Sequence, residues 1–242
     1  MHQFINKILK RRNEITDEGA KQIGIALKGC QQLKTVKLQL ESNQIRDNGV
    51  KSILLALNNC SLIESQKLNI SRNLIGDEGF EAISLWKNNN SFTKLDIKAY
   101  SNKISEKGAR YISTGIGNCS LLTSLKLILF ENSLGQEGAS ALGQGLSKLN
   151  NLTSLLLYID NNNISDEGYL KVDQCLSSLP KLSKLECFFS GSEKLLKSRD
   201  LLNCTNIRVL HLYLYSCSNQ NNRKEHRLKA LKIKRLVLLK RN

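Results

Sequence analysis

The sequence predicts an α/β solenoid built from stacked strand–turn–helix units, and a shared period in three features supports this. A glycine recurs with spacings of 30, 30, 29, 30 and 30 residues, at Gly19, Gly49, Gly79, Gly108, Gly138 and Gly168. An asparagine precedes each glycine by six residues, at Asn13, Asn43, Asn73, Asn102, Asn132 and Asn162. An apolar pattern repeats with them, and a fixed period of about 20 to 50 residues is typical of solenoids.

The apolar pattern of each unit changes from a strand period to a helix period. Alternating apolar residues before the asparagine predict a strand. The runs are Val36, Leu38, Leu40; Leu68, Ile70; Leu95, Ile97, Ala99; Leu125, Leu127, Leu129; and Leu155, Leu157, Ile159. After the glycine the spacing becomes helical, as at Ile23, Ala26 and Leu27. Each unit is therefore predicted to be a strand, a turn and a helix.

The pattern L-x-x-L-x-L followed by N-x-I-x-D-E-G-x-x-x-I resembles the leucine-rich repeat of the ribonuclease-inhibitor type, over nearly the whole chain. The resemblance implies a horseshoe with a curved parallel sheet on the concave face and helices on the convex face. It also implies that the asparagines bond the backbones of neighbouring turns in a ladder. The unit is longer than usual between strand and asparagine, and this 30-residue variant resembles repeats of asparagine- and lysine-rich protist proteins.

We expect residues 1–242 to form a single leucine-rich-repeat domain of about seven repeats, since such repeats are stable only when stacked. Residues 1–13 are predicted to be a partial N-terminal repeat. Residues 193–242 are predicted to be degenerate, basic C-terminal repeats or a cap, because Ser192 stands where an asparagine is expected. End repeats of solenoids are atypical.

The net charge of +15 is concentrated at the two ends of the chain. Residues 13–180 hold 17 basic and 17 acidic residues, whereas residues 181–242 hold 15 basic and 4 acidic. No apolar run reaches the roughly 18 residues that span a bilayer, and the N-terminal segment does not read as a signal peptide. The expected location is the cytoplasm, with association to the cytoskeleton as a hypothesis.

Cysteines and acidic residues recur at fixed repeat positions and are given structural roles. Cysteines at one position are predicted to be small buried hydrophobes; they are Cys30, Cys60, Cys119 and Cys204. For the acids before the recurring glycine we favour helix capping over the alternative, a stacked metal-binding column. This set includes Asp17, Glu18, Asp77, Glu78, Asp166 and Glu167, with Thr16, Ser105 and Ser165 as capping residues.

Outward strand positions are predicted to line the concave face, because side chains alternate along a strand. These positions are polar in the first half of the chain and rich in aromatic residues from Tyr100 onward. An exposed aromatic cluster usually marks a protein interface; the alternative is that the C-terminal segment folds over it. The candidate partner-binding residues are Tyr100, Ile128, Phe130, Leu156, Tyr158, Phe188, His211, Tyr213 and Tyr215.

The basic C-terminal end is a second candidate contact region. It could meet an acidic protein surface, nucleic acid or acidic lipid, or it could be a solvated basic end. The residues concerned are Arg223, Lys224, Arg227, Lys229, Lys232, Lys234 and Arg235.

No catalytic residue, cofactor or metal site is predicted. The spacing of Cys204, His211, Cys217 and His226 matches no compact zinc ligand set. The glycine pairs of the helical segments lack the lysine of a phosphate-binding loop.

We therefore predict that the chain is not an enzyme but a protein–protein interaction scaffold, a subunit of a larger assembly for which a cytoskeletal one is a hypothesis. The alternative is binding of RNA or another polyanion through the basic end and the concave aromatics, since aromatic rings beside basic residues can stack single-stranded bases. A third hypothesis, a regulator of a small GTPase, comes only from the resemblance and has no specific residue in its support.

Overall fold

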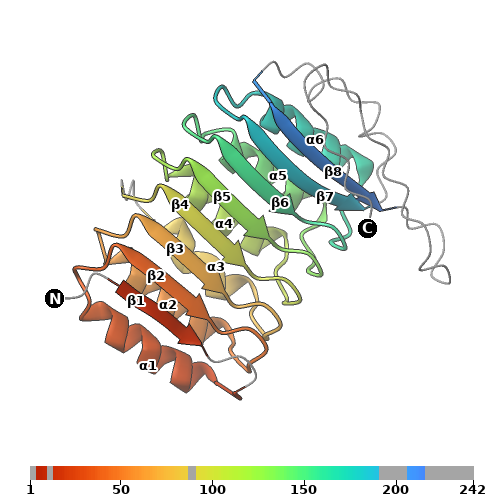
Figure 1. The fold of residues 1–242 in the computed structure, drawn as a ribbon. Coiled ribbons are helices and arrows are strands. Elements are labelled where there is room, and N and C mark those ends of the chain that lie inside the picture. The colour runs from red at the N-terminus through yellow and green to blue at the C-terminus, as the bar shows by residue number, and fades with distance from the viewer. Residues whose placement is uncertain (1–3, 10–12, 87–90, 191–205, 216–242) are drawn as a thin grey trace.

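The computed structural model describes residues 4–9, 13–86, 91–190 and 206–215. In these residues eight parallel strands form one open sheet whose order follows the chain (Figure 1). The strands are β1 (Phe4–Leu9), β2 (Thr35–Gln39), β3 (Ser65–Asn69), β4 (Lys94–Lys98), β5 (Ser124–Ile128), β6 (Ser154–Tyr158), β7 (Lys184–Ser190) and β8 (Val209–Tyr215). The helices are α1 (Asp17–Lys28), α2 (Asp47–Asn58), α3 (Asp77–Ser84), α4 (Glu106–Gly117), α5 (Gly135–Leu146) and α6 (Asp166–Ser177).

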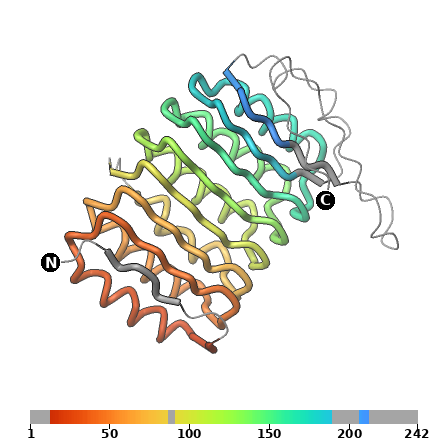
Figure 2. The backbone as a smooth tube through the Cα atoms, viewed as in Figure 1, coloured from red at the N-terminus to blue at the C-terminus, as the bar shows by residue number. Residues whose placement is uncertain are grey.

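All six described helices lie on one side of the sheet and leave the other side open (Figure 1). The backbone trace shows the same strand, turn and helix path repeated along the array (Figure 2). A helix occupies about 10 Å across the stack, whereas neighbouring strands lie about 4.8 Å apart. The sheet must therefore lie on the inner, concave side, and we call its uncovered surface the open face.

The core lies between the sheet and the helices and is built from the apolar residues of each repeat. In β5 and its extension, Leu125, Leu127 and Leu129 are at most 1% exposed. Ile112 and Ile116 of α4 and Leu142 of α5 are also fully buried in this layer. The described part of the chain is thus the α/β leucine-rich-repeat solenoid that the sequence predicts, with the strand faces in the predicted orientation.

An asparagine ladder joins the turns that follow the strands, as the resemblance implies. The Asn132 side-chain amide donates to the backbone oxygens of Leu129 and Phe130 in its own repeat, and of Ala99 in the preceding repeat. Its Oδ1 accepts from the Ile104 backbone N–H at 3.0 Å. Equivalent bonds are made by Asn73, Asn102 and Asn162, in each case to the preceding repeat.

A second ladder, of aspartates, connects the N-termini of successive helices. Asp77 Oδ1 accepts from the backbone N–H groups of Ser105 and Gly108, at 2.7 and 3.0 Å. Asp17 and Asp47 bond the start of the following helix in the same way. The capping role is therefore correct for Asp17, Asp47 and Asp77, but each of these aspartates caps the helix of the next repeat.

Two of the structural predictions need correction. Thr16 makes no capping hydrogen bond, unlike Ser105 and Ser165; it is exposed beside the first described helix, where water can satisfy the free N–H groups. Cys30, in the same repeat, is only partly buried, whereas Cys60 and Cys119 are buried as predicted. Burial raises the pKa of Cys119 to about 12, so this thiol is chemically inert.

Candidate functional site

The outward side chains form three rows across the open face, because the strands pair without a shift from β2 to β8. The first row is Lys37, Lys67, Asp96, Lys126, Leu156, Glu186 and His211. The second row is Gln39, Asn69, Lys98, Ile128, Tyr158 and Phe188. A third row, two residues further along, includes Glu41, Ser71, Tyr100, Phe130 and Asp160. Side chains of successive repeats therefore lie side by side within each row.

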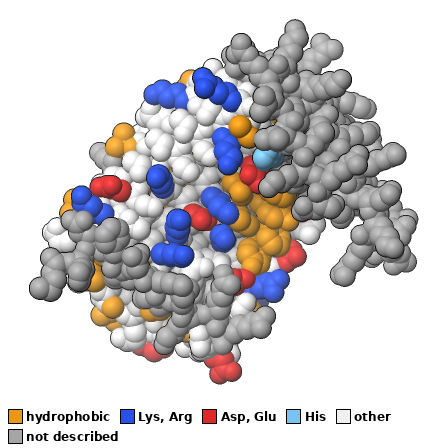
Figure 3. Space-filling model, viewed as in Figure 1, with side chains coloured by type: hydrophobic (Ala, Val, Ile, Leu, Met, Phe, Trp, Pro, Cys, Tyr) orange, Lys and Arg blue, Asp and Glu red, His pale blue; other side chains and the backbone are white. Residues whose placement is uncertain are grey.

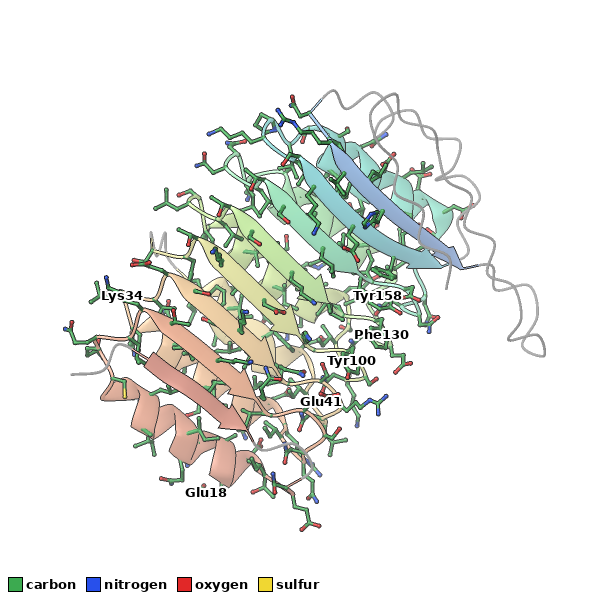
Figure 4. The ribbon with its side chains drawn as sticks, viewed as in Figure 1. Glu18, Lys34, Glu41, Tyr100, Phe130 and Tyr158 are labelled. Atoms are coloured by element: carbon green, nitrogen blue, oxygen red, sulfur yellow. The ribbon has the colours of Figure 1, made fainter. Side chains whose placement is uncertain are left out.

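Four aromatic rings stack in a continuous line at the carboxyl ends of the strands, and we call them the aromatic ladder. Ring centroids are 4.4 Å apart for Tyr100 and Phe130, 4.5 Å for Phe130 and Tyr158, and 4.4 Å for Tyr158 and Phe188. Figure 4 shows Tyr100, Phe130 and Tyr158 following one another along this edge of the sheet. The ladder changes from the third row to the second between Phe130 and Tyr158, because Asp160 takes the third-row position of that repeat.

The ladder rings cover one another's faces and present their edges to solvent. The interplanar angles are 8°, 28° and 27° along the line, so the rings are close to parallel. Each of the four side chains is partly exposed. Ile128 lies beside Tyr158 in the second row, and Leu156 lies two residues before Tyr158 on the same strand face. Together they form the hydrophobic patch that Figure 3 shows on the open face.

Polar contacts hold the first ring of the ladder. The Tyr100 hydroxyl donates to Glu41 Oε1, and the Asn69 side-chain amide donates to Glu41 Oε2 at 3.0 Å. The Arg72 guanidinium lies 5.8 Å from the centroid of the Tyr100 ring. The outer face of Tyr100 is therefore occupied by a cation, which is a favourable partner for a π face.

The other predicted contact residues fall at the far end of the sheet or outside the described residues. His211 is half-buried, and its Nδ1 lies 3.8 Å from Glu186 Oε2. Tyr213 and Tyr215 belong to β8, where their backbones pair with Phe188 and Ser190. All basic C-terminal candidates, from Arg223 to Arg235, lie outside the described residues, so that region stays a prediction.

Four lysines, Lys37, Lys67, Lys98 and Lys126, lie on the open face, and two of them, Lys98 and Lys126, are register neighbours of Ile128 and Leu156 in the hydrophobic patch. None of them makes an ion pair with a described acid. Lysines on the helix side behave differently. Lys51 and Lys107 each bind a glutamate of the neighbouring repeat at 2.5 Å, Glu81 and Glu78.

Asp160 is a buried acid beside the ladder that the sequence analysis missed. Its side chain is 5% exposed, and its Oδ1 has no hydrogen-bond partner in the described structure. Burial, with a smaller contribution from the nearby charge of Glu131, raises the pKa of Asp160 to about 7. The only sequence signal was an acid at a third-row position that the two preceding repeats fill with aromatic rings.

The described residues offer little for chemistry. No group of three histidine, cysteine or acidic side chains in them could hold a metal ion. A groove on the helix side, between α1 and α2, is lined by side chains of both charges, including Asp17, Lys21 and Lys51. No helix of the described part is long and apolar enough to cross a bilayer.

Comparison with known proteins agrees with the repeat architecture. A family model described as Leucine Rich repeat matches residues 33–54 and 66–84. No curated protein matches the chain. The matched segments agree with the leucine-rich-repeat fold seen in the open parallel sheet and the asparagine ladder; the ribonuclease-inhibitor type stays a prediction.

Several solved structures match the chain at low sequence identity and low TM-score. The actin-binding site 2 of leiomodin-1 has 15% sequence identity and a TM-score of 0.44, with 74% of this chain and 86% of that chain covered. An internalin from Listeria monocytogenes has 22% identity and a TM-score of 0.32, with 66% of this chain and 49% of that chain covered. A plant peptide hormone receptor has 13% identity and a TM-score of 0.22, with 78% and 48% covered.

Proposed function

We propose that this chain is a non-catalytic interaction scaffold that binds a protein partner through the aromatic ladder and the adjoining Ile128 and Leu156. The observation that carries the proposal is the line of four partly exposed, mutually stacked rings on an otherwise polar face. Solvent-exposed apolar side chains that gather in one patch mark interaction sites on soluble proteins.

The stacking suits the ladder to tight binding. Rings fixed by their neighbours have already lost side-chain freedom, so a partner that packs on them meets a smaller entropic cost. Large aromatic side chains near the centre of an interface commonly contribute about 2 kcal/mol or more to binding. Phe130 and Tyr158 are the central rings and are therefore the proposed anchors.

The wider setting of this scaffold is a hypothesis based on the sequence. The basic C-terminal end would favour an assembly with acidic surfaces, and a cytoskeletal assembly in the cytoplasm is one such setting. Of the two candidate contact regions, the open face lies within the described residues, whereas the basic end lies outside them and stays untested.

The test compares Tyr158→Ala with Leu121→Ala, which truncates a leucine that is 45% exposed and outside the three rows of the open face. The full chain serves as bait to recover partners from the native cell type. The recovered partners are identified, and their affinities for the unaltered chain and for both variants are then measured. We expect Tyr158→Ala to weaken a direct partner by about 2 kcal/mol and Leu121→Ala to change nothing.

The thermal melts of the same variants separate an interface from an internal lid. Loss of ring stacking alone should destabilise Tyr158→Ala by about 1 kcal/mol. If instead the C-terminal segment covers the ladder, the substitution should destabilise the chain by about 3 to 5 kcal/mol. A large loss of stability with unchanged partner recovery contradicts the proposed function.

A further inference from the structure

The open face joins an unpaired basic area to the aromatic ladder. Lys98 is the second-row neighbour of Ile128, and Lys126 is the first-row neighbour of Leu156. One strand spacing, about 4.8 Å, separates such neighbours at the backbone. A single extended or helical segment of a partner can therefore touch the apolar patch and these lysines at once.

The lysines of this area outnumber the described acids of the same two rows. The first row carries Lys37, Lys67 and Lys126 with Asp96 and Glu186, and Lys98 extends the positive area in the second row. Lys51 and Lys107 on the helix side bind glutamates, whereas these four lysines make no ion pair with a described acid and are available for a counter-charge from a partner. The basic C-terminal end of this chain cannot supply the counter-charge, because residues 181–242 hold 15 basic and 4 acidic residues.

The orientation of the rings favours a protein over a single-stranded nucleic acid. Bases bind proteins by stacking on exposed aromatic faces. In the ladder the faces of Phe130 and Tyr158 are covered on both sides, and the outer face of Tyr100 is covered by Arg72. The exposed ring edges carry partial positive charge, so they suit aliphatic groups, further ring faces and carboxylates.

We infer that the open face binds an acidic protein segment that carries an aliphatic or aromatic anchor, with the anchor on Phe130, Tyr158 and Leu156 and the flanking carboxylates on Lys98 and Lys126. This inference rests on the proposed function and adds the chemistry of the partner to it. The lysines select for charge and steer the encounter, while the ladder supplies the buried contact.

A selection with short random peptides displayed on phage tests the inference on the full chain. The inferred chemistry predicts enriched peptides with aspartate or glutamate flanking leucine, phenylalanine or tryptophan. The best peptide, its glutamine-for-glutamate analogue and a uridine oligonucleotide are then measured by fluorescence anisotropy. We expect the charge-free analogue to bind about tenfold more weakly, which corresponds to about 1.4 kcal/mol.

Two double variants, each of which removes two positive charges, locate the contact. Lys98→Gln/Lys126→Gln should weaken the acidic peptide about tenfold and should reduce its salt dependence. Lys28→Gln/Lys171→Gln changes two helix residues by the same charge and should have little effect. The Tyr158→Ala variant should bind the acidic peptide no more tightly than the unaltered protein binds a peptide that lacks the anchor.

The outcomes separate the inference from the proposed function. Enriched peptides that are neutral or basic, yet depend on Tyr158, overturn the acidic partner and leave the ladder as a protein-binding site. Acidic peptides that bind independently of Tyr158 overturn the proposed site itself. Preferential binding of the uridine oligonucleotide through Lys98 and Lys126, or no enrichment at all, overturns the inference.

Discussion

The two faces of the same strands follow different rules in this chain. On the inner face the repeats place the same kind of side chain at each position, such as Leu95, Leu125 and Leu155, all at most 2% exposed. On the open face the same strands change from lysine to aromatic residues along the array. Packing against the neighbouring repeat constrains the inner face, whereas solvent leaves the open face free to vary. The clustering of rings on the free face therefore points to function and not to folding.

The largest expected effect tests this contrast on two adjacent residues. Leu127 is fully buried and Lys126 is its outward neighbour in β5. Leu127→Ala should lower the free energy of unfolding by about 2 to 5 kcal/mol, because it leaves a cavity in the core. Lys126→Ala should change the free energy of unfolding by less than about 0.5 kcal/mol, as is usual for surface sites. Denaturant unfolding of both variants is the measurement, and equal losses would mean that the two faces are not distinct.

Sequence periodicity was sufficient for the features that depend on each repeat alone. The strands and the open face follow from the spacing of residues such as Leu127 along the chain, and the asparagine ladder through Asn132 was expected only from the family resemblance. Other contacts between repeats were missed. The sequence does not show that Asp77 bonds the next helix, nor that the ladder crosses from one row to another at Tyr158, because both depend on where side chains of neighbouring repeats point.

Asp160 is an outward residue that is nevertheless buried, as Asn69 and Ser71 also are, and it is the acid among these three. Its folded-state pKa, raised to about 7, lies above the usual value of an aspartate in the unfolded chain. The folded state therefore holds a proton that the unfolded state has lost, so the stability from this group declines as the pH rises from about 4 to 7. Between pH 5 and pH 8, we expect the free energy of unfolding to fall by about 1 to 3 kcal/mol.

Two variants assign this pH dependence to Asp160. Asp160→Asn should remove it, and Asp96→Asn, at another acid of the open face, should preserve it. The comparison requires denaturant unfolding of all three proteins at both pH values. A pH dependence that survives in Asp160→Asn would assign the titration to another group.

Gln66 is the exception on the inner face, since it is a polar residue in a row that is otherwise apolar. It pairs in register with Val36 and Leu95, it is 1% exposed, and neither its amide oxygen nor its amide nitrogen has a hydrogen-bond partner in the described structure. An unsatisfied buried polar group costs about 1 to 3 kcal/mol. Gln66→Leu restores the repeat pattern at nearly constant volume and should raise the free energy of unfolding by about 1 kcal/mol. Gln39→Leu, on the open face of the preceding strand, provides the matched control and should give no comparable gain. Equal effects of the two substitutions, or a loss of stability in Gln66→Leu, would show that the inner face tolerates polar residues and would weaken the contrast between the faces.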